Sequence, residues 1–279
     1  MTENKYVDME KKLAELAVIA GNGNFPFLFL SEMKDKAEEV IVIALIGETD
    51  KKIEELGFPV FWANIGKLNK IISIMHDNNV KKAIMCGQVV HTKLFTEVKL
   101  DLRAIKLLSS LANKKTDSLL GAVALELESE GINLISSITY MQKWLPTEKG
   151  SWTKHKITDK VLKDIEFGFE TAKKIAGLDI GQTVVVKDNA VVAVEGLEGT
   201  DKCIYRGAEL AGNGIVVAKV NKPKQDDRFD VPVIGLQTFK VLAEVKAAAI
   251  CFESGKTLFF DKDECLKIAN ENNIGVYGI

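Results

Sequence analysis

Short, almost wholly apolar runs alternate with amphipathic segments in the first half of the chain, and this alternation is the strongest limit on its fold. The runs cover residues 13–20, 40–46, 59–62 and 82–86, and apolar residues recur at helical spacing between them. Strands that are apolar on both faces are typical of a parallel sheet covered by helices on both sides. We therefore predict a Rossmann-like parallel α/β domain over residues 1–145.

The second half also contains predicted strands and helices, but in a different order. Residues 146–157 are polar and irregular, with proline, glycine and three lysines, which predicts a linker. A long helix over 158–176 follows, with Asp164 expected on its solvent face, and then a hairpin that turns at residues 188–189. We expect a mixed C-terminal α/β domain over 158–279, with substrate in the cleft between the two domains.

Composition limits the classes of partner and compartment. The 279 residues include 47% hydrophobic and 27% charged side chains, enough for packed cores, and the formal net charge of −2 offers nucleic acid no general attraction. Four widely spaced cysteines show no zinc or disulfide pattern, as is typical of a reducing cytoplasm. The apolar run over 13–20 is too short to span a bilayer. We therefore expect a cytoplasmic protein that meets the inner membrane only peripherally, with no nucleic-acid partner.

Two glycine turns follow predicted strands of the first domain. Residues 21–23 (Gly-Asn-Gly) follow the first apolar run, and Gly87 follows the fourth. Glycine allows close backbone approach to a ligand, and ligands of open α/β sheets lie beyond the carboxyl ends of strands. Both turns are therefore expected at one crevice, although a simple tight turn is the alternative for each. Pro26 stands where a dinucleotide fingerprint has its third glycine, which argues against a nicotinamide cofactor.

Two further segments place polar groups at expected helix starts. Thr116 and Asp117 follow two lysines, where capping of the next helix is the favoured interpretation and contact with a sugar hydroxyl or a metal is the alternative. The segment 195–201 (EGLEGTD) follows a strand and carries carboxylates that could bind magnesium. For Thr200 and Asp201 in this segment, a helix cap competes equally with a functional role.

The segment 219–235 is the richest in chemistry. It leaves a strand and contains three lysines, one arginine and three aspartates before the next helix. An enzyme that breaks a phosphoanhydride needs cations to neutralise phosphoryl oxygens and carboxylates to hold magnesium or orient water. A solvated charged loop is the alternative interpretation. Because no serine or cysteine nucleophile motif is present, activated water is the preferred nucleophile.

Several of these segments together resemble a known family. The motifs are IAGNGNFP at 19–26, LDIGQ at 178–182, VEGLEGTD at 194–201 and KPKQDDRFDVPVIG at 222–235. They run in order across nearly the whole chain, with the Gly87 turn and residues 116–120 between the first and second. They resemble the magnesium-dependent UDP-2,3-diacylglucosamine hydrolase family of Gram-negative bacteria.

This resemblance implies a reaction in lipid A biosynthesis. Water would attack the pyrophosphate of UDP-2,3-diacylglucosamine and release UMP and 2,3-diacylglucosamine 1-phosphate, with Mg²⁺ as cofactor. Asp230, in the RxDxP motif, would be the catalytic carboxylate. The implied substrate contacts are Gly21, Asn22, Gly23, Gly87, Gln88, Asp117, Thr200, Asp201, Lys219, Lys222, Gln225 and Arg228. The candidate magnesium ligands are Glu195, Asp226 and Asp230, with Asp201 as a further candidate.

Other functions and partners stay open at this point. A non-catalytic protein that binds a sugar nucleotide or lipid would keep the glycine turns and the basic residues without needing Asp230. A nicotinamide oxidoreductase would rest on the strand–glycine–helix opening alone. Beside the lipid-linked UDP-sugar, a second copy of the chain is a further candidate partner. Acyl chains need an apolar lining, for which the candidates are Phe25, Phe27, Leu28, Phe61 and Trp62, with burial in the core as the alternative.

Overall fold

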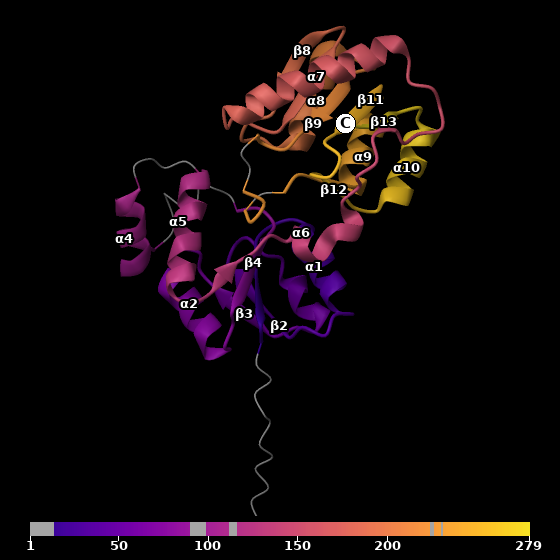
Figure 1. Cartoon of the computed structure of the whole chain (residues 1–279). Helices are drawn as coiled ribbons and strands as arrows, with labels where there is room; N and C mark the ends of the chain where they lie inside the picture. Colours follow the sequence, from indigo (N-terminus) through magenta and orange to yellow (C-terminus); the bar gives the residue numbers. More distant parts are fainter. Residues whose placement is uncertain (1–13, 90–98, 112–115, 224–225, 230) are drawn as a thin grey trace, which may run out of the picture. The chain divides into compact units, whose positions relative to one another are not determined.

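A computed structural model describes the chain at residues 14–89, 99–111, 116–223, 226–229 and 231–279 (Figure 1). It separates into two compact units, Met1–Tyr140 and Met141–Ile279. The first contains a parallel sheet and the second a mixed sheet, and helices pack on both. The prediction of two α/β domains is therefore confirmed.

The first unit has a five-stranded parallel sheet in the order β3-β2-β1-β4-β5. Every residue of its two central strands, β1 and β2, is buried, which explains why the sequence shows continuous apolar runs there. The strands are β1 (Leu16–Ala20), β2 (Val40–Leu45), β3 (Val60–Ala63), β4 (Lys82–Cys86) and β5 (Asn133–Leu134).

Helices connect these strands. Asp101 caps one of them, because its Oδ1 accepts the backbone N–H of Ala104 over 2.9 Å. The segment Lys51–Leu56 between β2 and β3 is a 3-10 helix, which is usual for so short a segment. The helices are α1 (Phe25–Met33), η1 (Lys51–Leu56), α2 (Leu68–Asp77), α4 (Leu102–Ser110), α5 (Thr116–Ser129) and α6 (Ile138–Met141).

The second unit has a six-stranded mixed sheet in the order β6-β13-β11-β9-β7-β8. Strands β9, β11 and β13 are parallel, whereas β7 runs antiparallel to its neighbours β8 and β9. The main strands are β7 (Thr183–Lys187), β8 (Ala190–Val194), β9 (Val216–Lys219), β11 (Ala249–Phe252) and β13 (Gly275–Gly278), and a separate parallel pair is formed by β10 (Val233–Ile234) and β12 (Leu258–Phe259).

Helices cover both faces of this sheet. Helix α7 (Asp159–Gly177) packs on one face, with Ile165, Ala172 and Ala176 in the core. The opposite face is covered by α8 (Thr200–Ala211), α9 (Leu236–Glu244) and α10 (Lys262–Glu271). Strand β9 follows α8, β11 follows α9 and β13 follows α10, and these three strands are parallel. The amino ends of the three helices therefore lie where the strands end, at the carboxyl edge of the sheet.

The β7–β8 hairpin turns at Asp188 and Asn189, as predicted, and both residues have positive φ. Asp164 of α7 accepts the backbone N–H groups of both turn residues, at 3.0 and 2.6 Å. Its side chain is therefore buried, and our expectation that it faces solvent is wrong. The carboxylate is tolerated there because the turn supplies two donors for it.

Residues 146–157, the predicted linker, contain β6 (Gly150–Ser151), which pairs with β13. Trp152 follows, and its ring packs against Phe252 and Phe259 at centroid distances of 5.8 and 6.3 Å. This segment thus adds an edge strand to the second unit, together with a partly buried tryptophan that packs against its core.

All four cysteines are buried and unpaired. Burial raises the pKa of Cys203, Cys251 and Cys265 to about 12, so these thiols are protonated at neutral pH. They are core side chains and not nucleophiles. In the described part of the chain, no helix is long and apolar enough to cross a membrane.

Candidate functional site

The two glycine turns of the first unit meet, because β1 and β4 are neighbours in the sheet. The Gly21 N–H donates to the Cys86 carbonyl over 2.7 Å, and Asn22 and Gln88 exchange two backbone hydrogen bonds of 2.6 and 3.0 Å. A Cβ on Gly21 would lie 2.4 Å from the Gln88 carbonyl oxygen, and one on Gly87 would lie 2.5 Å from that of Asn22. Both positions therefore require glycine, because any side chain there would clash with the backbone of the other turn. Binding of substrate by these turns stays a prediction.

The first turn leads directly into α1. Gly23 has a φ of +90°, and its N–H donates to the Asn22 Oδ1 over 2.7 Å. Among the described residues, no side chain caps the amino end of α1. An uncapped helix start beside exposed glycine backbone is suited to a phosphate or another anionic group.

A buried threonine anchors this turn, and sequence reasoning missed it. The Thr49 hydroxyl donates to the Ala20 carbonyl over 2.5 Å and accepts the Leu45 N–H over 2.9 Å. It therefore ties the end of β1 to the end of β2. The residue follows a predicted strand by a few positions, which was its only signal.

In the second unit, three predicted site residues form one hydrogen-bonded chain at the carboxyl edge of the sheet. The Lys219 Nζ donates to the Thr200 Oγ1 over 2.9 Å, and this hydroxyl donates to the Glu195 Oε1 over 3.0 Å. Lys219 ends β9, Glu195 follows β8, and Thr200 begins α8. Segments that are far apart in the sequence thus place an ammonium, a hydroxyl and a carboxylate side by side.

The alternative that Thr200 or Asp201 only caps α8 is wrong. The N-cap is Gly199, with a φ of +84°, and no described side chain caps this helix. Thr200 is the first helical residue, and Asp201 lies in the first turn, where its charge favours the helix dipole.

The LDIGQ motif packs against the same group. A Cβ on Gly181 would lie 2.1 Å from the Glu195 carbonyl oxygen, so the two backbones touch. Asp179, with a φ of +60°, pairs with the Lys222 Nζ over 2.6 Å. The structure thus brings together three of the motif segments. Asp179 had no predicted role, because nothing in its local sequence indicates that its partner is Lys222.

Just beyond β9 lies a second polar group, centred on the buried Glu253. Its Oε2 accepts from the Lys173 Nζ over 2.8 Å and from the Asn221 N–H over 3.1 Å, while its Oε1 accepts from the Lys256 Nζ over 2.8 Å. Burial alone would raise the pKa of the Glu253 carboxyl, but these hydrogen bonds outweigh it and lower the pKa from its ordinary value. The sequence predicted no role for Lys173, Glu253 or Lys256, and it included Asn221 only as part of the charged segment 219–235.

The described part of the charged loop contains a local ion pair. Asp226 accepts from the Arg228 Nε over 2.9 Å and from its Nη2 over 2.7 Å. These hydrogen bonds lower the pKa of Asp226. The Arg228 guanidinium also lies 5.1 Å from the centre of the Phe229 ring. A metal ion at Asp226 would have to compete with Arg228.

Several predicted site groups cannot be placed. Asp230 and Gln225 lie outside the described residues, as does the side chain of Asp117. Within the residues that are described, no three Asp, Glu, His or Cys side chains are grouped so that they could hold a metal ion. The described carboxylates therefore do not form a complete metal site by themselves. Mg²⁺ ordinarily binds one or two carboxylates together with substrate phosphates, a pattern for which Glu195 remains a candidate.

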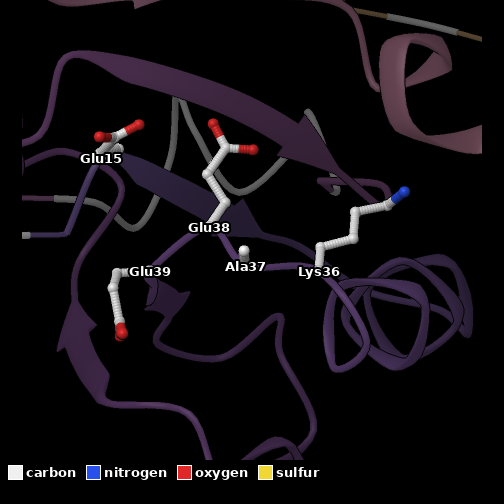
Figure 2. A pocket seen from close by; sticks show the side chains of 5 residues that line it. All are labelled: Glu15, Lys36, Ala37, Glu38 and Glu39. Carbon is white, nitrogen blue, oxygen red and sulfur yellow. The ribbon is translucent and has the colours of Figure 1, made fainter.

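A surface pocket of about 430 Å³ lies in the first unit (Figure 2). Its lining comes from Glu15, which precedes β1, and from the segment 36–39, which precedes β2. It therefore lies at the amino ends of the strands, opposite the glycine turns. Three of its five lining residues are glutamates, which would repel a diphosphate, so we do not assign it to substrate.

Comparison with known proteins covers nearly the whole chain. The family model LpxI N-terminal domain matches residues 15–144, and the model LpxI C-terminal domain matches residues 148–277. The chain is 30% identical over 278 residues to the UDP-2,3-diacylglucosamine pyrophosphatase LpxI of Caulobacter vibrioides, which covers 96% of this chain and 98% of that protein.

Among solved structures, the biotin carboxylase domain of the Hydrogenobacter thermophilus 2-oxoglutarate carboxylase matches with 12% identity and a TM-score of 0.29. The match covers 72% of this chain and 42% of that one. A TM-score this low supports no conclusion about fold or function.

Proposed function

Because this chain belongs to the LpxI family, which it matches over both of its domains, we propose that it hydrolyses the pyrophosphate bond of UDP-2,3-diacylglucosamine. The products are UMP and 2,3-diacylglucosamine 1-phosphate, and the reaction is a step of lipid A biosynthesis. The observation that carries the proposal is the match along almost the full length of a relative named for this activity.

The carboxyl edge of the second sheet supplies groups suited to a diphosphate. Lys219 is held by the Thr200 hydroxyl, which takes one of the three donors of its ammonium group. The following loop contains two further cations, Lys222, which pairs with Asp179, and Arg228, which pairs with Asp226. Cations that are held in place before the reaction stabilise the charge that develops on phosphoryl oxygens. We assign Lys219 and Lys222 to the diphosphate.

Asp230 is the proposed catalytic carboxylate, acting as the base that orients and deprotonates the attacking water. Its loop leaves β9 at the edge that carries Lys219 and Thr200, and it ends at β10 just before α9. Mg²⁺ would neutralise the diphosphate and the leaving phosphate, with Glu195 as its candidate ligand among the described carboxylates.

The remaining contacts are assigned to the rest of the substrate. The two turns lie beside an uncapped helix start, which suits polar parts of a sugar nucleotide. The residues assigned to this role are Gly21, Asn22, Gly23, Gly87 and Gln88. Asp117 is assigned to the same ligand.

Apolar side chains also lie at the edge of the second sheet. Leu178 and Ile180, in the LDIGQ motif, are 67% and 50% exposed, and Leu197, between the two glycines of the neighbouring turn, is 93% exposed. The earlier candidates, Phe25 and Trp62 among them, are only partly exposed. A ligand with acyl chains is a suitable partner for exposed aliphatic side chains near a cation such as Lys219. Peripheral contact with the inner membrane, where such a lipid resides, belongs to the same proposal.

The proposal is tested with the purified chain, synthetic UDP-2,3-diacylglucosamine and Mg²⁺, by following UMP release. We expect release that depends on time and enzyme and that Asp230→Asn abolishes. Undiminished release by Asp230→Asn would show that another group is the base. Tight substrate binding without UMP release in any divalent cation would favour the non-catalytic binding protein instead.

A further inference from the structure

The charged loop leaves the sheet at Asn221, and one ion pair binds both backbone polar groups of this residue. The Glu253 Oε2 accepts the Asn221 N–H over 3.1 Å, and the Lys173 Nζ donates to the Asn221 carbonyl over 2.7 Å. Lys173 and Glu253 are joined directly by a 2.8 Å salt bridge. Lys173 belongs to α7, and Glu253 follows β11, so a helix and a strand both hold the start of the loop.

These side chains supply hydrogen bonds to the backbone of Asn221 beyond the point where the pairing of β9 with β11 ends. The last register pair between β9 and β11 is Lys219 with Phe252, so strand pairing does not extend to Asn221. Asn221 is nevertheless buried, and buried backbone groups require partners. The side chains of Lys173 and Glu253 supply these partners. They fix the direction in which the chain continues into Lys222.

Burial makes the Lys173–Glu253 pair different from the surface ion pairs of this protein. The Glu253 side chain is 11% exposed and that of Lys173 is 24% exposed. Lys160 and Asp188, by contrast, form a pair near the other end of α7 with exposures of 71% and 56%. A buried charge that loses its partner is strongly destabilised, whereas an exposed pair contributes little. The Lys160–Asp188 pair is therefore a matched control.

We propose that Lys173 and Glu253 are positioning residues for the reaction. Neither is assigned to substrate. Through Asn221 they hold the start of the charged loop, and thereby the direction in which the chain continues into Lys222 beside the end of β9. This inference rests on the proposed function. The pair differs from a purely structural feature because its loss should slow the chemical step more than it weakens substrate binding. A misplaced Lys222 would stabilise less of the charge that develops on the phosphoryl oxygens in the transition state, while Lys219, held separately by Thr200, would still bind the substrate.

The test is a double-mutant cycle on the full-length enzyme with Glu253→Gln, Lys173→Met and the double variant, and with Lys160→Met as control. Rates are normalised to the folded fraction, measured by circular dichroism at the assay temperature. We expect each single variant to lower kcat by about 10- to 100-fold while KM changes by less than about 3-fold, because small misplacements of reacting groups are costly. The double variant should be no slower than the slower single variant, because both act through one contact. Lys160→Met should match the wild type.

Amide hydrogen exchange supplies a readout that is independent of activity. In Glu253→Gln and in the double variant, exchange should accelerate at Asn221 and in the loop that follows, while the strands β7 and β9 stay protected. If a single variant does not fold, the double variant, which leaves no unpaired buried charge, carries the test alone.

Unchanged kcat, additive effects in the cycle, or unchanged exchange at Asn221 would each overturn the proposal. A rise in KM with kcat unchanged would also overturn it, since that result would assign the pair to binding. Absence of UMP release by the wild type would contradict the proposed function instead, and the exchange measurement would still decide whether the pair holds the loop.

Discussion

Lys219 donates a 2.9 Å hydrogen bond to Thr200, and this contact joins the end of β9 to the first residue of α8. The same hydroxyl donates to Glu195, so it lies between an ammonium and a carboxylate. The hydroxyl in this position holds the Lys219 ammonium near the carboxyl edge of the sheet. If Lys219 binds the diphosphate as proposed, this hydroxyl sets the position of the cation.

Removal of the Thr200 hydroxyl should weaken substrate binding. We expect Thr200→Val to raise KM by about 5- to 10-fold, which corresponds to the roughly 1 kcal/mol of a typical hydrogen bond. Thr200→Ser retains the hydroxyl and should stay within about 2-fold of the wild type. Steady-state UMP release over a range of substrate concentrations measures both. Equal losses in the two variants would show that the methyl group of Thr200, not its hydroxyl, matters.

The glycine turns of the first unit allow a matched pair of substitutions. Gly87→Ala places a Cβ 2.5 Å from the Asn22 carbonyl oxygen at a φ of +89°, whereas Gly47→Ala has a similar φ of +84° and meets nothing within 4 Å. Gly47→Ala should therefore cost about 1 kcal/mol of unfolding free energy for its backbone conformation alone. Gly87→Ala should cost about 2 kcal/mol more, because of the clash. Urea unfolding measures both, and equal costs would mean that the two turns do not touch in solution.

Much of the fold could be predicted because its signals are local. The buried strands β1 and β2 are continuous apolar runs, and their boundaries were predicted to within a few residues. The turn at Asp188 and Asn189 was equally clear, because two residues that tolerate positive φ separate two β-branched runs. Asp164 was mispredicted, since helical periodicity does not reveal that a distant turn supplies donors to a carboxylate.

The site was only partly predictable, for the same reason. Thr200 and Lys219 were found as separate residues of two motifs, but their hydrogen bond depends on the strand order β9-β7-β8, which local sequence does not specify. Lys173 and Glu253 are separated by 80 positions, and each looks like an ordinary surface charge in its own segment. Pairings of this kind follow from sheet register and helix packing, so they become visible only in three dimensions.

Stability of the second unit should depend on acidic pH through Glu253. In the folded state the pKa of Glu253 is lowered from its ordinary value of 4.5. The cause is that Lys173, Lys256 and the Asn221 N–H bind its carboxylate. A lowered folded pKa contributes stability that is fully present above the unfolded value and is lost as the pH falls through the folded one. We therefore expect the Tm to be steady from about pH 7 to pH 5 and to fall below pH 4.5. Calorimetry of the wild type and Glu253→Gln tests this, and the variant should show a shallower acid loss. Parallel curves would mean that Glu253 titrates alike in both states.

The exposed aliphatic side chains of the LDIGQ motif and of the turn before Thr200 give the last prediction. If Ile180 and Leu197 contact the acyl chains, the double variant Ile180→Ser/Leu197→Ser should raise KM for the diacyl substrate by about 10-fold or more, because burial of a large aliphatic side chain contributes about 1.5–3 kcal/mol. KM for a diacetyl analogue should not change, since its acyl groups are too short to reach the same contacts.

Leu210→Ser is the matched control, because Leu210 is 67% exposed but lies in the last turn of α8, at the end remote from Thr200. It should leave both KM values at the wild-type level. An equal rise for the diacyl and diacetyl substrates would contradict acyl contact and would instead show that Ile180 and Leu197 support the polar part of the site. A rise in Leu210→Ser as large as in the double variant would point to a general effect of lost surface hydrophobicity on the handling of a lipid substrate.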